Sequence, residues 1–217
     1  MAYPSVTVPY GLIPINLIGG QVFAGSTRLM PIPSGATTAI YYGDVVKLDS
    51  DGVLQKDTGT NTATPVGVFL GCTYTDATYG LTFRQYYPGS VTASDIKAYV
   101  LDDPDALFKV AVVADYNSTS VTYVNRTAVG NNAVLAQNTG STITGNSKVG
   151  IDDATGTTIS FPIRIVDVVP DTAIAGSPGS YTEVIVKWNS PYFTLAEGAP
   201  NTITWAGGHQ YLNPLGV

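Results

Sequence analysis

The sequence predicts an all-β protein, and three features of its composition support that class. Residues that favour helices are scarce, since glutamate occurs only at Glu183 and Glu197 and methionine only at Met1 and Met30. Thr, Val and Tyr are abundant instead, and β-branched and aromatic side chains pack well on a pleated sheet. With 23 Gly and 14 Pro in 217 residues, turns should be frequent and long helices are not expected.

Residues 1–35 are predicted to form an extended N-terminal arm. Five prolines disfavour both a helix and an interior strand, namely Pro4, Pro9, Pro14, Pro31 and Pro33. The segment nevertheless carries apolar side chains that require burial, at Ile13, Ile15, Leu17 and Ile18. Such a segment lies along another surface, which is either its own domain or a neighbouring subunit.

Residues 36–190 are predicted to form the β-rich core. A hairpin is expected from strands at 44–48 and 53–56, because Gly52 can adopt the left-handed conformation that closes a short loop. Further strands are expected at 65–70, 96–101 and 107–112, with a tight turn at 102–105. A Gly-, Asn- and Thr-rich insert follows at about 114–160, with short strand candidates at 121–124 and 133–136.

Two longer strands and a tail complete the chain. Strands are predicted at 159–169 and 181–189, and in the second Val184, Val186 and Trp188 share one face. Residues 191–217 form the predicted C-terminal tail, where prolines again interrupt the chain. Its aromatic side chains are candidates for contact with other molecules, at Tyr192, Phe193, Trp205 and Tyr211. The chain shows no internal repeat.

The low charge content favours a large contact with other subunits. Only 12% of the residues are charged, against about 25% in an average soluble domain, while 44% are hydrophobic. The alternative is a neutral, Thr-rich domain that stays soluble by itself. A net charge of -6 and ten scattered basic residues argue against nucleic acid as a partner.

No membrane partner and no export signal are expected. The apolar stretch at 12–18 is short and is interrupted by Pro14 and Asn16, so it does not read as a membrane span. No basic residue precedes Arg28, and a signal peptide begins with a basic region. Synthesis in the cytoplasm is therefore expected.

The sequence offers no catalytic constellation, and we expect neither a cofactor nor a metal site. The lone His209 is expected to be a surface or interface residue of the tail, and the single Cys72 a small apolar strand residue. The acidic cluster Asp102, Asp103 and Asp105 could gather a hard cation or act as paired carboxylates, but aspartate is also a common turn residue.

The order of several short blocks resembles structural proteins of tailed phages, including phages of marine cyanobacteria. These blocks lie at 11–14, 16–21, 23–28, 42–48, 65–68, 102–105, 107–110, 139–141, 144–147, 164–166 and 184–187. In particular, Gly-Asp-Val-Val-Lys-Leu at 43–48 followed by Pro-Val-Gly-Val at 65–68 is similar to the small β-tulip-like barrel of lambda-type head decoration proteins. This chain is much longer than that minimal barrel.

The resemblance implies a non-enzymatic head decoration (cement) protein. Such proteins form homotrimers that bind the major capsid protein on the outer surface of an expanded head and stabilise it against DNA pressure. The contact candidates come from the arm and the tail: Leu12, Ile13, Ile15, Leu17, Ile18, Phe23, Arg28, Tyr192, Phe193, Trp205 and Tyr211. Two alternatives remain, which are another virion subunit of the tail, neck or fibre, and a carbohydrate-binding or hydrolytic β module.

Overall fold

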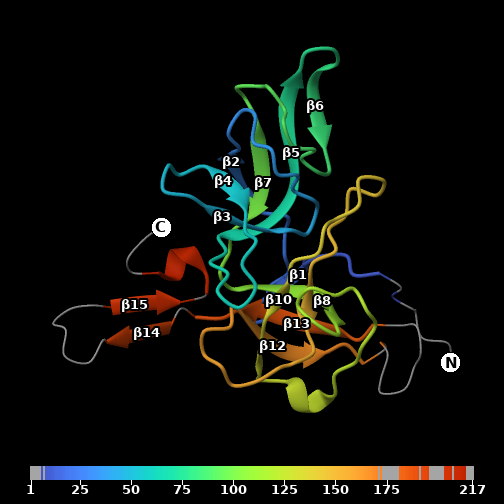
Figure 1. The fold of residues 1–217 in the computed structure, drawn as a ribbon, viewed down its shortest axis with the longest axis vertical. Helices are drawn as coiled ribbons and strands as arrows, with labels where there is room; N and C mark the ends of the chain where they lie inside the picture. The colour runs from blue at the N-terminus through green and yellow to red at the C-terminus, as the bar shows by residue number, and fades with distance from the viewer. Residues whose placement is uncertain are drawn as a thin grey trace.

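The computed structural model confirms the all-β class for the residues it describes. These are residues 6, 8–170, 172, 181–190, 192–195, 203–206 and 208–213, with the backbone alone in 192–195 and 203–206. Apart from strands, this part of the chain contains two single-turn 3-10 helices, η1 (Arg126–Ala128) and η2 (Gln210–Leu212). Its two larger sheets lie one above the other along the long axis of the molecule (Figure 1).

The upper sheet in Figure 1 has six strands and curves into a nearly closed barrel. Its strands are β2 (Arg28–Pro31), β3 (Val45–Leu48), β4 (Leu54–Lys56), β5 (Gly67–Asp76), β6 (Gly80–Arg84) and β7 (Lys97–Leu101). The order across the sheet is β2-β7-β5-β3-β4, and β6 also pairs with β5. Neighbouring strands are antiparallel throughout.

The lower sheet has seven strands. They are β1 (Ile13–Leu17), β8 (Ala106–Val113), β9 (Asn132–Ala133), β10 (Leu135–Ala136), β11 (Gly150–Asp152), β12 (Ile163–Val168) and β13 (Glu183–Trp188). The order is β10-β11-β8-β13-β12-β9, with β1 paired to β8, and only the short β11–β8 pair is parallel among the described strands. A separate hairpin joins β14 (Tyr192–Leu195) to β15 (Ile203–Ala206).

The chain has two main hydrophobic cores, and the lower one also takes in Val45, Val68 and Leu101 from strands of the upper sheet. Phe69, Tyr87 and Val100 lie in the upper core, whereas Phe108 and Trp188 lie in the lower one with their rings 5.2 Å apart. The chain crosses between the sheets at the turn from β7 to β8. The predicted turn at 102–105 is confirmed there, since the Asp105 backbone N–H donates to the Asp103 side chain over 2.8 Å.

The predicted hairpin at 44–56 is confirmed as β3 and β4. Gly52 has a φ of +71°, and its N–H donates to the Asp49 carbonyl over 3.0 Å, which closes the loop. Only glycine takes this backbone conformation without strain. The alternation predicted for the strand at 181–189 is confirmed from Val184 to Trp188, where Val184, Val186 and Trp188 are buried while Ile185 and Lys187 are half-buried. Glu183, on the same face as Ile185, is buried as well.

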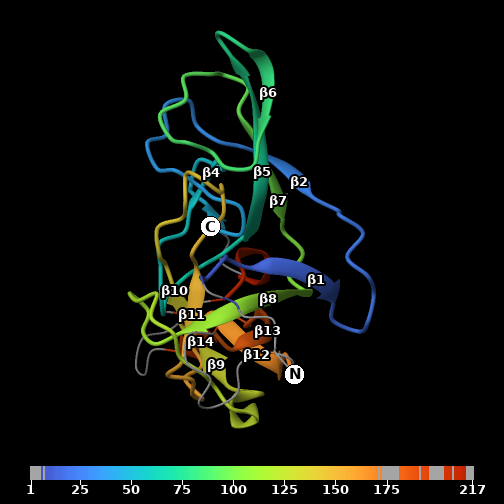
Figure 2. The ribbon, with the colours of Figure 1, turned by 90° about the vertical axis from the view of Figure 1, so that its right-hand side faces the viewer.

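The segment that was predicted to be an arm lies against the sheets of its own chain (Figure 2). Among the described strands, β1 pairs only with β8, and Pro14 is tolerated at such an edge position. Leu12 is fully buried in the lower core, and β2 pairs with β7 in the upper sheet. Deleting residues 1–30 would thus remove part of the core, so changes at single exposed positions are the better test of a contact role.

The segment that was predicted to be an insert contributes to the lower sheet. Strands β9, β10 and β11 all lie within residues 114–160, and Leu135 and Ile151 are fully buried. Of the two short strands expected here, the one at 133–136 corresponds to β9 and β10. Val121 instead makes a single bridge to Val113.

Candidate functional site

Three side chains from distant parts of the chain meet in one polar cluster. The Arg28 side chain forms an ion pair with Asp102 in which Nε and Oδ2 are 2.6 Å apart. The Tyr211 hydroxyl donates to the same Oδ2 over 2.9 Å. The Arg28 guanidinium carbon lies 5.7 Å from the centre of the Tyr211 ring, within range of a cation–π contact. Asp102 thus links the arm to the tail.

The local structure explains why these three residues meet. Arg28 is the first residue of β2, Asp102 directly follows β7, and Tyr211 lies in η2. Arg28 pairs with Val100 across the two strands, so its side chain emerges beside the end of β7. Burial and the bond to Asp102 raise the pKa of Tyr211 to about 12, so its hydroxyl stays protonated and remains a donor at neutral pH.

The polar cluster lines a groove of about 480 Å³, which we call the tail groove. Its lining residues are Leu17, Gln21, Val22, Phe23, Ala24, Ser26, Arg28, Leu101, Asp102, Asp103, Pro104 and Tyr211. An apolar side chain is exposed in the groove, since Val22 is 76% exposed, and Leu212, which follows Tyr211 in the sequence, is 44% exposed. The surface combines exposed apolar area with a fixed polar cluster, which suits the docking of another protein segment.

Four of the predicted contact residues line the tail groove: Leu17, Phe23, Arg28 and Tyr211. The other candidates lie elsewhere. Leu12 is buried in the core and is not available to a partner, Ile13 and Ile15 are half-buried in β1, and Ile18 is 45% exposed. The side chains of Tyr192, Phe193 and Trp205 lie outside the described residues.

The expectation that His209 lies at the surface is wrong. Its side chain is fully buried, and its ring lies 6.2 Å from that of Trp188 and 5.3 Å from that of Tyr211. The Tyr211 backbone N–H donates to His209 Nδ1 over 3.3 Å and caps η2. Burial lowers the pKa of His209 to about 4, against the weaker opposing effects of the Val66 backbone and of Asp102 and Asp103. His209 therefore anchors the tail as a neutral ring.

Gln210 anchors the tail to the upper sheet. Its side-chain oxygen accepts from the Leu48 N–H over 2.8 Å, and its side-chain nitrogen donates to the Leu48 carbonyl over 3.0 Å. The amide thus satisfies both backbone groups of a residue in β3, much as a neighbouring strand would. The contacts of His209 and Gln210 thus hold the residues that precede Tyr211 in place.

Replacing Gln210 by alanine is expected to lower the free energy of unfolding by about 1–2 kcal/mol, because the partly buried backbone N–H and C=O of Leu48 lose their partners. Urea denaturation measures this change. Gln85→Ala is the matched control, since Gln85 bonds Asn146 at an exposed site and its loss should cost less than about 0.5 kcal/mol. Equal effects of the two variants would contradict the anchoring role.

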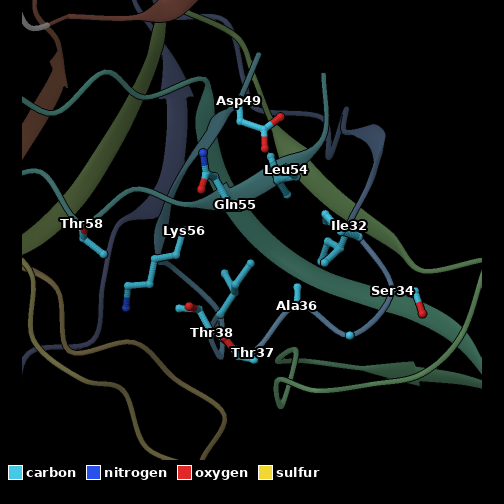
Figure 3. A pocket seen from close by; sticks show the side chains of 13 residues that line it. Ile32, Ser34, Ala36, Thr37, Thr38, Asp49, Leu54, Gln55, Lys56 and Thr58 are labelled. Atoms are coloured by element: carbon cyan, nitrogen blue, oxygen red, sulfur yellow. The ribbon is translucent and has the colours of Figure 1, made fainter. Parts of the chain in front are cut away.

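A second hollow of about 550 Å³ borders strand β4 and the loop at 32–40 (Figure 3). Asp49 and Lys56 lie apart along it, with Gln55 between them. The Lys56 amine is already paired with Asp44, 2.8 Å away in the protein interior. Of the residues that line this hollow, Asp49 alone carries a carboxylate.

The structure also shows a buried polar cluster that the sequence did not indicate. Asp44 is fully buried, and its carboxylate binds Lys56, the Tyr41 N–H at 2.9 Å and the Ser147 hydroxyl at 2.6 Å. Asp44 and Ser147 are 103 positions apart in the sequence. The only local signal was a charged residue at the start of an apolar strand, and aspartate is common in such turns.

The described residues contain no group of three or more His, Cys, Asp or Glu side chains placed to hold a metal ion. Within the same part of the chain, no helix has the length and the apolar character needed to cross a membrane.

Comparison with protein-family models, with curated proteins and with solved structures finds no match to this chain.

Proposed function

We propose that this chain is a structural virion subunit that decorates the outer surface of an expanded phage head and binds the major capsid protein through the tail groove. The proposal begins from the order of sequence blocks, which resembles tailed-phage structural proteins. An all-β fold with little charge is compatible with that role. The observation that supports the proposal most directly is the tail groove, where predicted contact residues from both ends of the chain come together.

The tail groove has the properties of a preformed docking site. The ion pair of Arg28 with Asp102 and the bond from Tyr211 fix its polar side before a partner arrives, which reduces the ordering cost of association. Val22, Leu212 and the partly exposed Phe23 supply apolar area. At about 25 cal/mol per Å² of buried apolar surface, a contact of a few hundred Å² contributes several kcal/mol before these costs.

The decisive experiment uses co-sedimentation to measure how tightly the purified protein binds expanded, undecorated heads of its source phage. Val22→Asp is expected to weaken this binding by about tenfold or more, because a charge is then buried against an apolar contact. Val22 is exposed in the free chain, so the variant should retain the melting temperature of the unmodified protein.

Ile143→Asp is the matched control, because Ile143 is 95% exposed and does not line the tail groove. It is expected to bind heads as tightly as the unmodified protein. If Val22→Asp bound heads as tightly as Ile143→Asp, the capsid contact would lie outside the tail groove. Failure of the unmodified protein to bind heads, or its binding to tails or fibres instead, would refute the proposed head role.

A further inference from the structure

The hairpin of β5 and β6 carries an exposed apolar strand at the end of the molecule. It stands beyond the rest of the upper sheet in both views (Figures 1 and 2). Leu81 is 78% exposed and Phe83 is 63% exposed, and both belong to β6. Among the described strands β6 pairs with β5 alone, so its other edge has no strand beside it.

The backbone groups of β6 that face this free edge can be identified from its neighbours. Thr75 lies opposite Leu81, and its N–H donates to the Asp95 side chain over 3.1 Å, on the side of β5 that faces β7. Thr75 and Leu81 are therefore a non-hydrogen-bonded pair, in which both residues direct their backbone groups away from each other. The N–H and C=O of Leu81, and those of Phe83 two residues later, point to the free edge.

This edge is complementary to itself. A two-fold axis beside Thr82 would place Leu81 of one copy opposite Phe83 of the other in an antiparallel pair. The outward N–H and C=O groups of these residues would then match as four interchain hydrogen bonds. Leu81 and Phe83 of both copies would lie on one face of the joined sheet, where the apolar surface continues through Tyr99, whose ring contacts Phe83 at 5.7 Å.

The charges of the hairpin fit the same pairing. Neither Arg84 nor Asp76 forms an ion pair among the described residues. The Arg84 side chain bonds that of Tyr74 within the chain, but its Nε is buried without a hydrogen-bond partner. In the antiparallel pair Arg84 lies opposite Gly80 of the second copy, and Asp76 is the next residue across that copy's hairpin. Gly80 has no side chain and open space around it, so Arg84 of each copy can reach Asp76 of the other.

We propose that β6 is a homodimerisation edge, at which two copies of this chain pair antiparallel about a two-fold axis and exchange Arg84–Asp76 ion pairs. Exposed edge strands are ordinarily protected by lysine, by proline or by a covering segment, and the exposed residues between Gly80 and Arg84 carry none of these. The proposal is independent of head binding, and it predicts a dimer where the resemblance to decoration proteins implies a trimer.

Sedimentation velocity of the full chain tests the pairing at protein concentrations from about 1 to about 100 µM. A contact of this small size should form within that range. The unmodified protein is expected to shift from monomer to dimer. Leu81→Lys should remain monomeric across the range, because lysine on an edge strand opposes pairing. Ile143→Lys, at an apolar position that is even more exposed, should dimerise like the unmodified protein.

A mixing experiment tests the two-fold geometry itself. Arg84→Glu alone and Asp76→Lys alone should each lose dimerisation, since like charges would then face each other at both contacts. An equimolar mixture of the two variants should dimerise, because each mixed contact again pairs opposite charges, and no intrachain effect can produce that rescue. Because Asp76 also accepts bonds from the Thr78 and Tyr79 N–H groups, both variants are first checked by circular dichroism.

Three outcomes would overturn the proposal. They are a monomeric unmodified protein at every concentration, dimerisation by Leu81→Lys equal to that of the unmodified protein, or two folded charge variants that do not dimerise when mixed. If Asp76→Lys does not fold, the comparison of Leu81→Lys with Ile143→Lys decides whether β6 is the dimer contact.

Discussion

Replacing Asp44 by alanine is expected to lower the free energy of unfolding by about 3–5 kcal/mol, because the change leaves the Lys56 ammonium buried without a counter-ion. The Lys56 side chain is only 9% exposed and the Asp44 side chain is fully buried, so water cannot replace the lost carboxylate. The variant also removes the acceptor for the Tyr41 N–H and for the Ser147 hydroxyl. The bond from Ser147 connects the start of β3 to a residue 103 positions later in the chain.

Urea denaturation followed by circular dichroism measures this loss. Arg126→Ala is the matched control, because Arg126 and Asp167 form an ion pair of nearly the same length, 2.9 Å, whose side chains are 76% and 43% exposed. Removing that exposed pair should cost at most about 1 kcal/mol. Similar losses for Asp44→Ala and Arg126→Ala would show that burial of the Asp44 pair does not determine its contribution.

A double variant separates the buried charge from the lost hydrogen bonds. Asp44→Ala combined with Lys56→Met leaves no unpaired charge in the interior, so it should be more stable than Asp44→Ala alone. A double variant that is no more stable would assign the loss to the bonds with Tyr41 and Ser147 instead.

The stability of the protein is expected to fall by about 2 kcal/mol between about pH 8 and about pH 5 through His209 alone. The folded chain holds the pKa of His209 at about 4, below its ordinary value of 6.5, because the ring is buried. On acidification the unfolded chain therefore takes up the proton first. The stabilising contribution is complete above about pH 6.5, declines as the pH falls toward about 4, and changes no further below that.

Protonation of His209 also acts on the tail directly. Nδ1 accepts the Tyr211 N–H in the folded chain, and a protonated Nδ1 is a donor that cannot make this bond. Because Tyr211 lines the tail groove, release of the tail at low pH should open that groove.

Urea denaturation at a series of pH values measures the dependence on His209. His209 is the single histidine of the chain, so the difference between the unmodified protein and His209→Gln isolates its titration from that of the carboxyl groups. The variant is expected to be less stable at neutral pH and to show a flatter profile between about pH 7 and about pH 5. Parallel profiles would show that His209 titrates alike in both states.

Some features could be predicted from the sequence because their causes act over a few residues. The hairpin closed by Gly52, the turn at 102–105 and the alternation in β13 follow from turn chemistry and from the two-residue period of a strand. The scarcity of helix-forming residues was sufficient for the all-β class. For the tail groove, the sequence identified apolar and aromatic residues at both ends of the chain without indicating which of them would meet.

The tertiary structure decided the features that depend on contacts between distant residues. Gln210 binds Leu48 across 162 positions, and Tyr211 reaches Asp102 across 109, distances over which no local pattern carries information. The same holds for the burial of Leu12 and His209. The arm residues and the tail histidine look like surface residues because their own segments cannot form a core. They are buried because the two sheets present apolar faces and unsatisfied backbone groups, and these segments cover them.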